Sequence, residues 1–175
     1  SARTLSTTNS FIVTVSEVNT APVLTLPADT NIVEQVAWSA LATGSDSDLP
    51  SNPLTFGLVS GPTGVAVAAG GVISWTPTEA QGPGVYTVTV SVTDTNASAA
   101  SARTLSTTNS FIVTVSEVNT APVLTLPADT NIVEQVAWSA LATGSDSDLP
   151  SNPLTFGLVS GPTGVAVAAG GVISW

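Results

Sequence analysis

Hydrophobic and polar residues alternate along several short stretches of the chain. In GVYTVTVSVTD (84–94), a face of tyrosine and valine alternates with a face of threonine and serine. The segment SFIVTVSEV shows the same period of two, at 10–18 and again at 110–118. This pattern, carried by β-branched and aromatic residues, predicts half-buried β-strands.

Other stretches also predict strands, and none predicts a helix. Turn-forming residues such as DLPSNP, SGPTG and EAQGPG separate the apolar runs. No segment combines helical periodicity with helix caps. About seven short strands in roughly 100 residues is the pattern of an immunoglobulin-like Greek-key β-sandwich, so we expect an all-β fold. The further predicted strands are 22–26, 36–42, 53–60, 64–68 and 71–75.

The sequence repeats. Residues 1–75 are identical to residues 101–175, so the period is 100 residues. A unit of this length is large enough to bury its own core. We expect residues 1–18 to be the last strand of a preceding repeat and 19–118 to be a complete sandwich. Residues 119–175 would then hold the first five strands of a following, truncated repeat.

The chain carries few charges, and nearly all of them are acidic. It has 12 Asp and Glu against two Lys and Arg, no His and a net charge of −10. Nucleic acid and anionic membranes are therefore poor partners, and no apolar stretch is long enough to span a bilayer. The sequence also lacks Cys and Lys, so the usual nucleophile–base pairs are missing and we expect no enzyme.

Two predicted strands end in a carboxylate. Asp94 continues the inward-facing phase of 84–94, and Glu17 continues that of Phe11, Val13 and Val15. A carboxylate at the inward end of a sandwich loses hydration and needs a counter-charge, which two arginines cannot supply. A cation held by oxygen ligands, above all calcium, is the expected partner.

Five motifs follow one another in each period. Together they resemble a bacterial cadherin-like repeat, of the dystroglycan-type or Ig-like variety found in large surface proteins, and the resemblance covers the whole period. The motifs are SEVNTAPVL (16–24), VEQ (33–35), GSDSDLPSNPLTFGLVSGPTG (44–64), GVISWTPTEAQGPGVYTVTVSVTD (71–94) and the following FIVTVSEVNTAP.

The resemblance implies calcium at the joints between repeats stacked end to end. Asn19 resembles the linker asparagine, Asp46 and Asp48 the Asp-x-Asp pair, and Asp94 the aspartate that closes the penultimate strand. These four would share one ion at the upper end of the repeat.

A second ion is implied at the lower end. Glu34, Glu79 and the linker residue Glu117 would meet Asp148 of the next repeat around it. The upper site recurs in that repeat at Asn119, Asp146 and Asp148.

The sequence departs from the cadherin-like pattern at the linker and near SWTPTE. The usual linker Asp-x-Asn-Asp is Glu-Val-Asn-Thr, and an acidic pair is reduced to Glu79. We therefore expect one or two ions at each joint rather than three. Of the 12 acids, only Asp29 and Asp129 lie outside the strand-end and implied positions. The other ten are Glu17, Glu34, Asp46, Asp48, Glu79, Asp94, Glu117, Glu134, Asp146 and Asp148.

Each of these residues also has a simpler interpretation. Asp46 and Asp48 can form Asx-turns, Asn19 can be a turn residue, and Asp94 can start a hairpin. Glu79 would suit an exposed loop in any case.

Three further residues have competing interpretations. Trp38 and Trp75 are predicted to be core residues, with a sugar-binding platform as the alternative. Asn96, in NAS, matches a glycosylation acceptor, although such short matches are common by chance.

The sequence therefore predicts a structural spacer. It would be an extracellular stalk or filament on a bacterial cell surface, with identical sandwich repeats stiffened by calcium at the joints. Its partners would be neighbouring repeats of the same chain and other copies in a fibre. The alternatives are an adhesin or carbohydrate-binding module, and a fibre subunit that bundles laterally through its Thr, Ser and Val faces.

Overall fold

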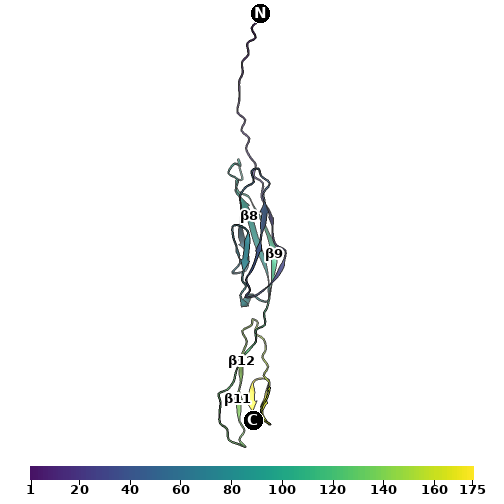
Figure 1. Cartoon of the computed structure of the whole chain (residues 1–175), viewed down its shortest axis with the longest axis vertical. Helices are drawn as coiled ribbons and strands as arrows, with labels where there is room; N and C mark the ends of the chain where they lie inside the picture. Colours follow the sequence, from purple (N-terminus) through teal and green to yellow (C-terminus); the bar gives the residue numbers. More distant parts are fainter. The chain divides into compact units, whose positions relative to one another are not determined.

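A computed structural model describes residues 1–175, and it consists almost entirely of strands and loops (Figure 1). The single helical element is a three-residue 3-10 turn, so no helix could cross a membrane. The all-β prediction is confirmed. The elements are β1 (Val23–Thr25), β2 (Thr30–Val33), β3 (Trp38–Leu41), β4 (Thr43–Ser45), β5 (Leu54–Ser60), β6 (Ala66–Val67), β7 (Val72–Trp75), η1 (Glu79–Gln81), β8 (Gly84–Asp94), β9 (Ser106–Ser116), β10 (Val123–Thr125), β11 (Ser139–Leu141), β12 (Thr143–Ser145), β13 (Ala166–Val167) and β14 (Val172–Ser174).

The chain divides into two compact units, each built from several segments. Unit 1 contains Ser1–Thr30, Ala37–Trp75 and Tyr86–Val113. Unit 2 contains Asn31–Val36, Thr76–Val85 and Thr114–Trp175.

The two longest strands, β8 and β9, are the inner strands of a four-stranded sheet with the order β2-β9-β8-β5. A three-stranded sheet has the order β3-β7-β6, and β1 pairs with β4. In β8 the burial alternates as its sequence predicts, with buried valines and a buried Asp94 between partly exposed threonines and serines. The inward phase predicted for Asp94 is thus confirmed.

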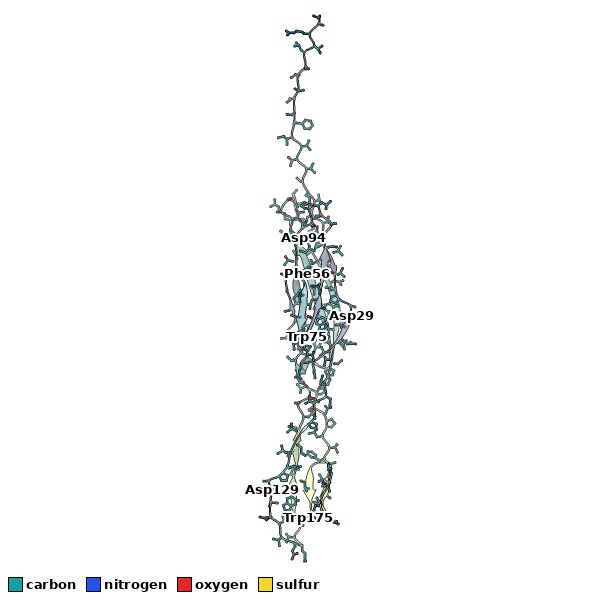
Figure 2. The ribbon with its side chains drawn as sticks, in the orientation of Figure 1. Asp29, Phe56, Trp75, Asp94, Asp129 and Trp175 are labelled. Atoms are coloured by element: carbon teal, nitrogen blue, oxygen red, sulfur yellow. The ribbon has the colours of Figure 1, made fainter.

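The core of unit 1 is mainly aliphatic and also contains the buried rings of Trp75 and Phe111. Ile73, Val88 and Val90 are almost fully buried. Trp75, labelled in Figure 2, is 2% exposed, and its ring packs edge-on against Tyr86 with centroids 5.2 Å apart. Its indole N–H donates to the carbonyl of Thr63 at 3.2 Å. Trp75 is therefore a core residue, as predicted.

Trp38 lies nearer the surface. It is half-buried, and its ring centroid lies 6.3 Å from that of Phe111. This position makes Trp38 part of the margin of the core.

Two identical segments have different structures. Residues 106–116 form β9, where Phe111 is 4% exposed, whereas the matching residues 6–16 form no strand and Phe11 is 87% exposed. A strand needs neighbours for its backbone N–H and C=O groups, and β9 has β2 and β8. The only β-pairing of residues 1–18 is an isolated bridge from Glu17 to Ala99, so the strand expected there is absent from this structure.

Residues 119–175 form five strands, although not the five expected. Residues 153–160 form no strand, because their counterpart β5 pairs with β8 and no copy of β8 lies within 119–175. The fifth strand is instead β12, at residues 143–145. The sequence pattern predicted neither β12 nor its counterpart β4. The short strand β2 was missed as well.

Candidate metal centres

Three glutamates from separate parts of the chain meet in unit 2, and we call them the glutamate cluster. Glu34 follows β2, Glu79 opens η1 and Glu117 follows β9. One carboxylate oxygen from each lies within 4.8 Å of the others. Glu34 is fully buried, and the other two are half-buried. The ends of the strands thus bring together acids that are far apart in sequence.

Hydrogen bonds satisfy only part of the glutamate cluster. Glu34 Oε1 accepts from the backbone N–H of Val118 at 3.1 Å, and Glu79 Oε1 accepts from that of Leu149 at 3.0 Å. Glu34 Oε2 and both carboxylate oxygens of Glu117 are buried and have no hydrogen-bond partner in the protein. Because an unpartnered buried carboxylate is costly, this cluster needs protons or a cation.

The surroundings of Glu117 favour its neutral form. Burial of its carboxylate is the largest cause of a raised pKa, followed by the negative charges of Glu34 and Glu79. The close approach of the Glu34 carboxyl group and the charge of Asp148 raise the pKa of Glu117 further. Asp148 is itself 1% exposed. The four acids implied for the lower site therefore lie in one neighbourhood.

The backbone is shaped around Glu34. A side-chain carbon at Gly82 would lie 2.1 Å from Glu34 Oε2, so any larger residue there would have to displace this carboxylate. Gln35, with φ of 57°, turns the chain directly after Glu34, and its amide donates to Glu79 Oε2. Glu34 is thus an enclosed carboxylate rather than part of an exposed acidic patch.

Three aspartates form a second group in unit 1, the aspartate cluster. Asp46 and Asp48 follow β4, and Asp94 ends β8. One carboxylate oxygen from each lies within 4.8 Å of the others. Asp94 (Figure 2) is fully buried and Asp48 is 6% exposed.

The aspartate cluster also has oxygens without partners. Asp94 Oδ1 accepts from the backbone N–H of Leu105 at 2.8 Å and from the amide of Asn19 at 2.9 Å. Asp46 Oδ1 accepts from the backbone N–H of Asp48 at 2.8 Å, which is the Asx-turn considered as the alternative. The buried Asp46 Oδ2 and Asp94 Oδ2 have no partner. The turn therefore forms and still leaves an oxygen of Asp46 unpartnered.

Two asparagines complete the surroundings of the aspartate cluster. Asn19 is 8% exposed, and its amide donates to Ala102 O at 3.1 Å as well as to Asp94. Asn52 donates to Asn19 Oδ1 at 3.3 Å and to Asp48 Oδ2 at 3.0 Å. Asn52 could not be recognised from the sequence, because PSNP is typical of any turn.

The second copy keeps the same local bonds without forming a group of three acids. Asp146 Oδ1 accepts from the N–H of Asp148 at 2.9 Å. Asn152 donates to Asn119 Oδ1 at 2.9 Å and to Asp148 Oδ2 at 3.1 Å. Asn119 is exposed, and no copy of Asp94 lies within 119–175.

The remaining acids lie outside both clusters. Glu134 is exposed, although it occupies the same place in the repeat as the buried Glu34. Glu17 is half-buried and accepts from the side-chain amide of Asn96. Asp29 is exposed, and its Oδ1 accepts from the N–H of Ile112 at 2.7 Å.

The chemistry of both clusters fits a hard divalent cation. The side-chain atoms that could ligate a metal are carboxylate oxygens and the amide oxygens of asparagine, and the chain contains neither His nor Cys. Calcium takes six to eight oxygen ligands from carboxylates, carbonyls and water. The buried oxygens without partners supply the observation that an ordinary acidic surface would not show. The glutamate and aspartate clusters can therefore hold calcium.

Known proteins show the same fold. The family model described as bacterial Ig domain matches residues 19–108. A structure of protocadherin gamma B2 extracellular cadherin domains 3–6 is similar, with 18% identity, a TM-score of 0.53, and coverage of 90% of this chain and 45% of that chain. The Drosophila N-cadherin EC1–4 structure is 20% identical, with a TM-score of 0.58, and the match covers 89% of this chain and 40% of that one.

These comparisons establish the fold class. The chain has the Ig-like and cadherin-like sandwich fold, and it spans less than half the length of these two cadherin structures. No curated protein matches the chain.

Proposed function

The chain belongs to the bacterial Ig domain family, and from that premise we propose that it is a structural spacer on a cell surface. It would be part of an extracellular stalk or filament in which identical β-sandwich repeats are joined end to end. The observation that supports this most strongly is the pair of enclosed acidic clusters with unpartnered oxygens. Such clusters suit joints that a cation from outside the cell completes.

The glutamate cluster and the nearby Asp148 come from the parts of the chain that a joint must fix. Glu34 and Glu79 belong to one repeat, Glu117 lies in the linker, and Asp148 belongs to the next repeat. Without a counter-charge these carboxylates repel one another and hold the linker loosely. A bound calcium ion would supply the positive charge that allows them to stay together. The chain's own residues then determine the angle at the joint.

The repetition of the sequence supports a role in which length matters. Residues 1–75 recur unchanged at 101–175, so neighbouring repeats of the same chain are the proposed partners at each joint. Extracellular calcium modules bind at about 10⁻⁴–10⁻³ M, which suits a surface bathed in calcium.

Calorimetric titration of the full chain with calcium tests this function. We expect binding in the range of about 10⁻⁴–10⁻³ M. Glu34→Gln should weaken or abolish one class of site. Glu134→Gln is the matched control, because it changes the same residue of the repeat where it is exposed. Absence of heat and of any effect of calcium on unfolding would exclude calcium at these clusters.

A laterally bundling fibre is the second candidate. Leu41 and Val72 are paired in register on β3 and β7, and they are 56% and 48% exposed. Their counterparts Leu141 and Val172 are equally exposed. Sedimentation at increasing concentration tests this, and Leu41→Ser should reduce any association that occurs.

A further inference from the structure

Asn96 is a buried polar residue that neither acidic cluster uses. It lies in the loop between β8 and β9, and it is 3% exposed. Its Oδ1 accepts from the backbone N–H groups of Ser98 at 3.0 Å and Ala99 at 3.1 Å. Its amide donates to the carboxylate of Glu17. An asparagine with this burial and these bonds is unsuited to carry a glycan, so the NAS motif needs another explanation.

The loop that contains Asn96 holds the linker that enters the repeat. The backbone carbonyl of Glu17 accepts from the N–H of Ala100 at 3.3 Å, and Glu17 forms a parallel bridge with Ala99. Two residues further on, the amide of Asn19 donates to the carbonyl of Ala102 in the same loop. Both linker residues are thus bonded directly to the loop.

The other linker of the chain has no such loop beside it. Glu117 occupies the same place in the repeat as Glu17, yet both of its carboxylate oxygens are without partners. No copy of Asn96 lies within residues 119–175. The chain therefore presents one linker glutamate with an asparagine partner and one without.

We propose that Asn96 is a positioning residue that latches the linker glutamate to the repeat that follows, independently of metal. Its Oδ1 shapes the loop, and its amide holds the Glu17 carboxylate, so one side chain joins the two. Carboxylates that ligate metals are themselves hydrogen-bonded by neighbouring groups, and Asn96 supplies such a bond. Each linker then moves with the repeat downstream, and the metal-dependent step is confined to the Glu34 and Glu79 side.

Only the role of the latch in an array of repeats rests on the proposed function. The contacts of the latch can be tested without calcium. Amide hydrogen exchange of the full chain in chelator gives separate reporters. The N–H of Ala100 reports the latch, and those of Ser98 and Ala99 report the loop turn. The N–H groups of Val90 and Val113, in β8 and β9, report global unfolding.

Asn96→Asp keeps the acceptor that shapes the loop and replaces the amide donor with a carboxylate facing Glu17. We expect exchange at Ala100 to accelerate by about tenfold or more, while the turn and core reporters change little. The double variant Asn96→Asp with Glu17→Gln reverses donor and acceptor, and it should restore slow exchange at Ala100. If Asn96→Asp unfolds the chain, Glu17→Ala removes the partner alone and should accelerate exchange at Ala100 in the same way.

Unchanged exchange at Ala100 in the folded single variants would overturn the latch. The latch would also be overturned if Asn96→Asp accelerated hydrogen exchange equally at Ser98, Ala99 and Ala100 and the added Glu17→Gln did not reverse it. That result would mean that Asn96 only shapes the loop turn. Neither result depends on calcium. A failed calcium titration with an intact latch would remove the proposed function and leave this inference standing.

Discussion

Glu34→Gln should change the stability of the chain in opposite directions with and without calcium. Glu34 is fully buried, and its Oε2 has no partner and lies under the backbone of Gly82. Glutamine keeps the shape and the oxygen that accepts from Val118. It also places an amide donor where the cluster has only acceptors. In chelator, the substitution therefore removes the cost of a buried carboxylate oxygen without a partner, and it adds a hydrogen-bond donor to the cluster.

The magnitude follows from the cost of an unpartnered buried group. Leaving such a group unsatisfied costs about 1–3 kcal/mol, so Glu34→Gln should stabilise the metal-free chain by about that amount. At about 5 mM calcium, a site with a dissociation constant of about 10⁻⁴–10⁻³ M adds about 1–2 kcal/mol per ion to the parent chain. The variant should lose much of that gain.

Denaturant unfolding measures both effects, because the midpoint reports stability when the slope is unchanged. Glu134→Gln and Asp29→Asn are controls outside the clusters, and each should change stability by less than about 0.5 kcal/mol. If Glu34→Gln destabilises the chain equally in chelator and in calcium, Glu34 acts through packing alone and the reasoning is wrong.

Two further predictions follow from the surroundings of single residues. In chelator, the raised pKa of Glu117 means that this carboxyl group keeps its proton above pH 4.5 in the folded chain and loses it there in the unfolded chain. The contribution of Glu117 to stability should therefore be fully present below pH 4.5 and should be lost as pH rises through its folded pKa. Unfolding midpoints measured across pH report this decline, and Glu117→Gln should remove it. A decline of the same size in Glu117→Gln would contradict this assignment. Phe111→Ala should cost about 3–5 kcal/mol in the unfolding free energy, because Phe111 is buried in β9. Phe11→Ala, at the identical but exposed position, should cost less than about 0.5 kcal/mol, and similar costs for the two would refute the assigned environments.

Alternation of residues predicted the long strands and the acids at their ends. The period of two in 84–94 directs Asp94 inward, because successive side chains alternate between the faces of a strand. The same alternation places Glu117 directly after β9, whereas the strand predicted to end at Glu17 does not form. These inferences succeeded because they depend on local backbone geometry.

Pairing could not be predicted in the same way. Residues 6–16 and 106–116 are identical, yet only the second segment forms a strand. The difference lies in the strands beside them, and a local pattern carries no information about neighbours. Short strands such as β2 and β4 were missed for the same reason, since their residues have little alternation of their own.

The candidate sites were predicted in part. Resemblance placed the acids, and the structure brings Asp46, Asp48 and Asp94 together. Asn52 and Asn96 were not selected as parts of a site, because an asparagine in a loop resembles any turn residue until its partners are known. Their hydrogen bonds to linker residues arise from segments 33 and 79 residues apart.

The spread of distances between repeats tests the central claim most directly. The chain has no cysteine, so Thr43→Cys and Thr143→Cys place spin labels at equivalent exposed positions of two repeats. Pulsed electron paramagnetic resonance then measures the distance distribution in chelator and in calcium. We predict a broad distribution in chelator that narrows in calcium, with no narrowing in the Glu34→Gln background. Equal widths in chelator and calcium would contradict a calcium-stiffened joint.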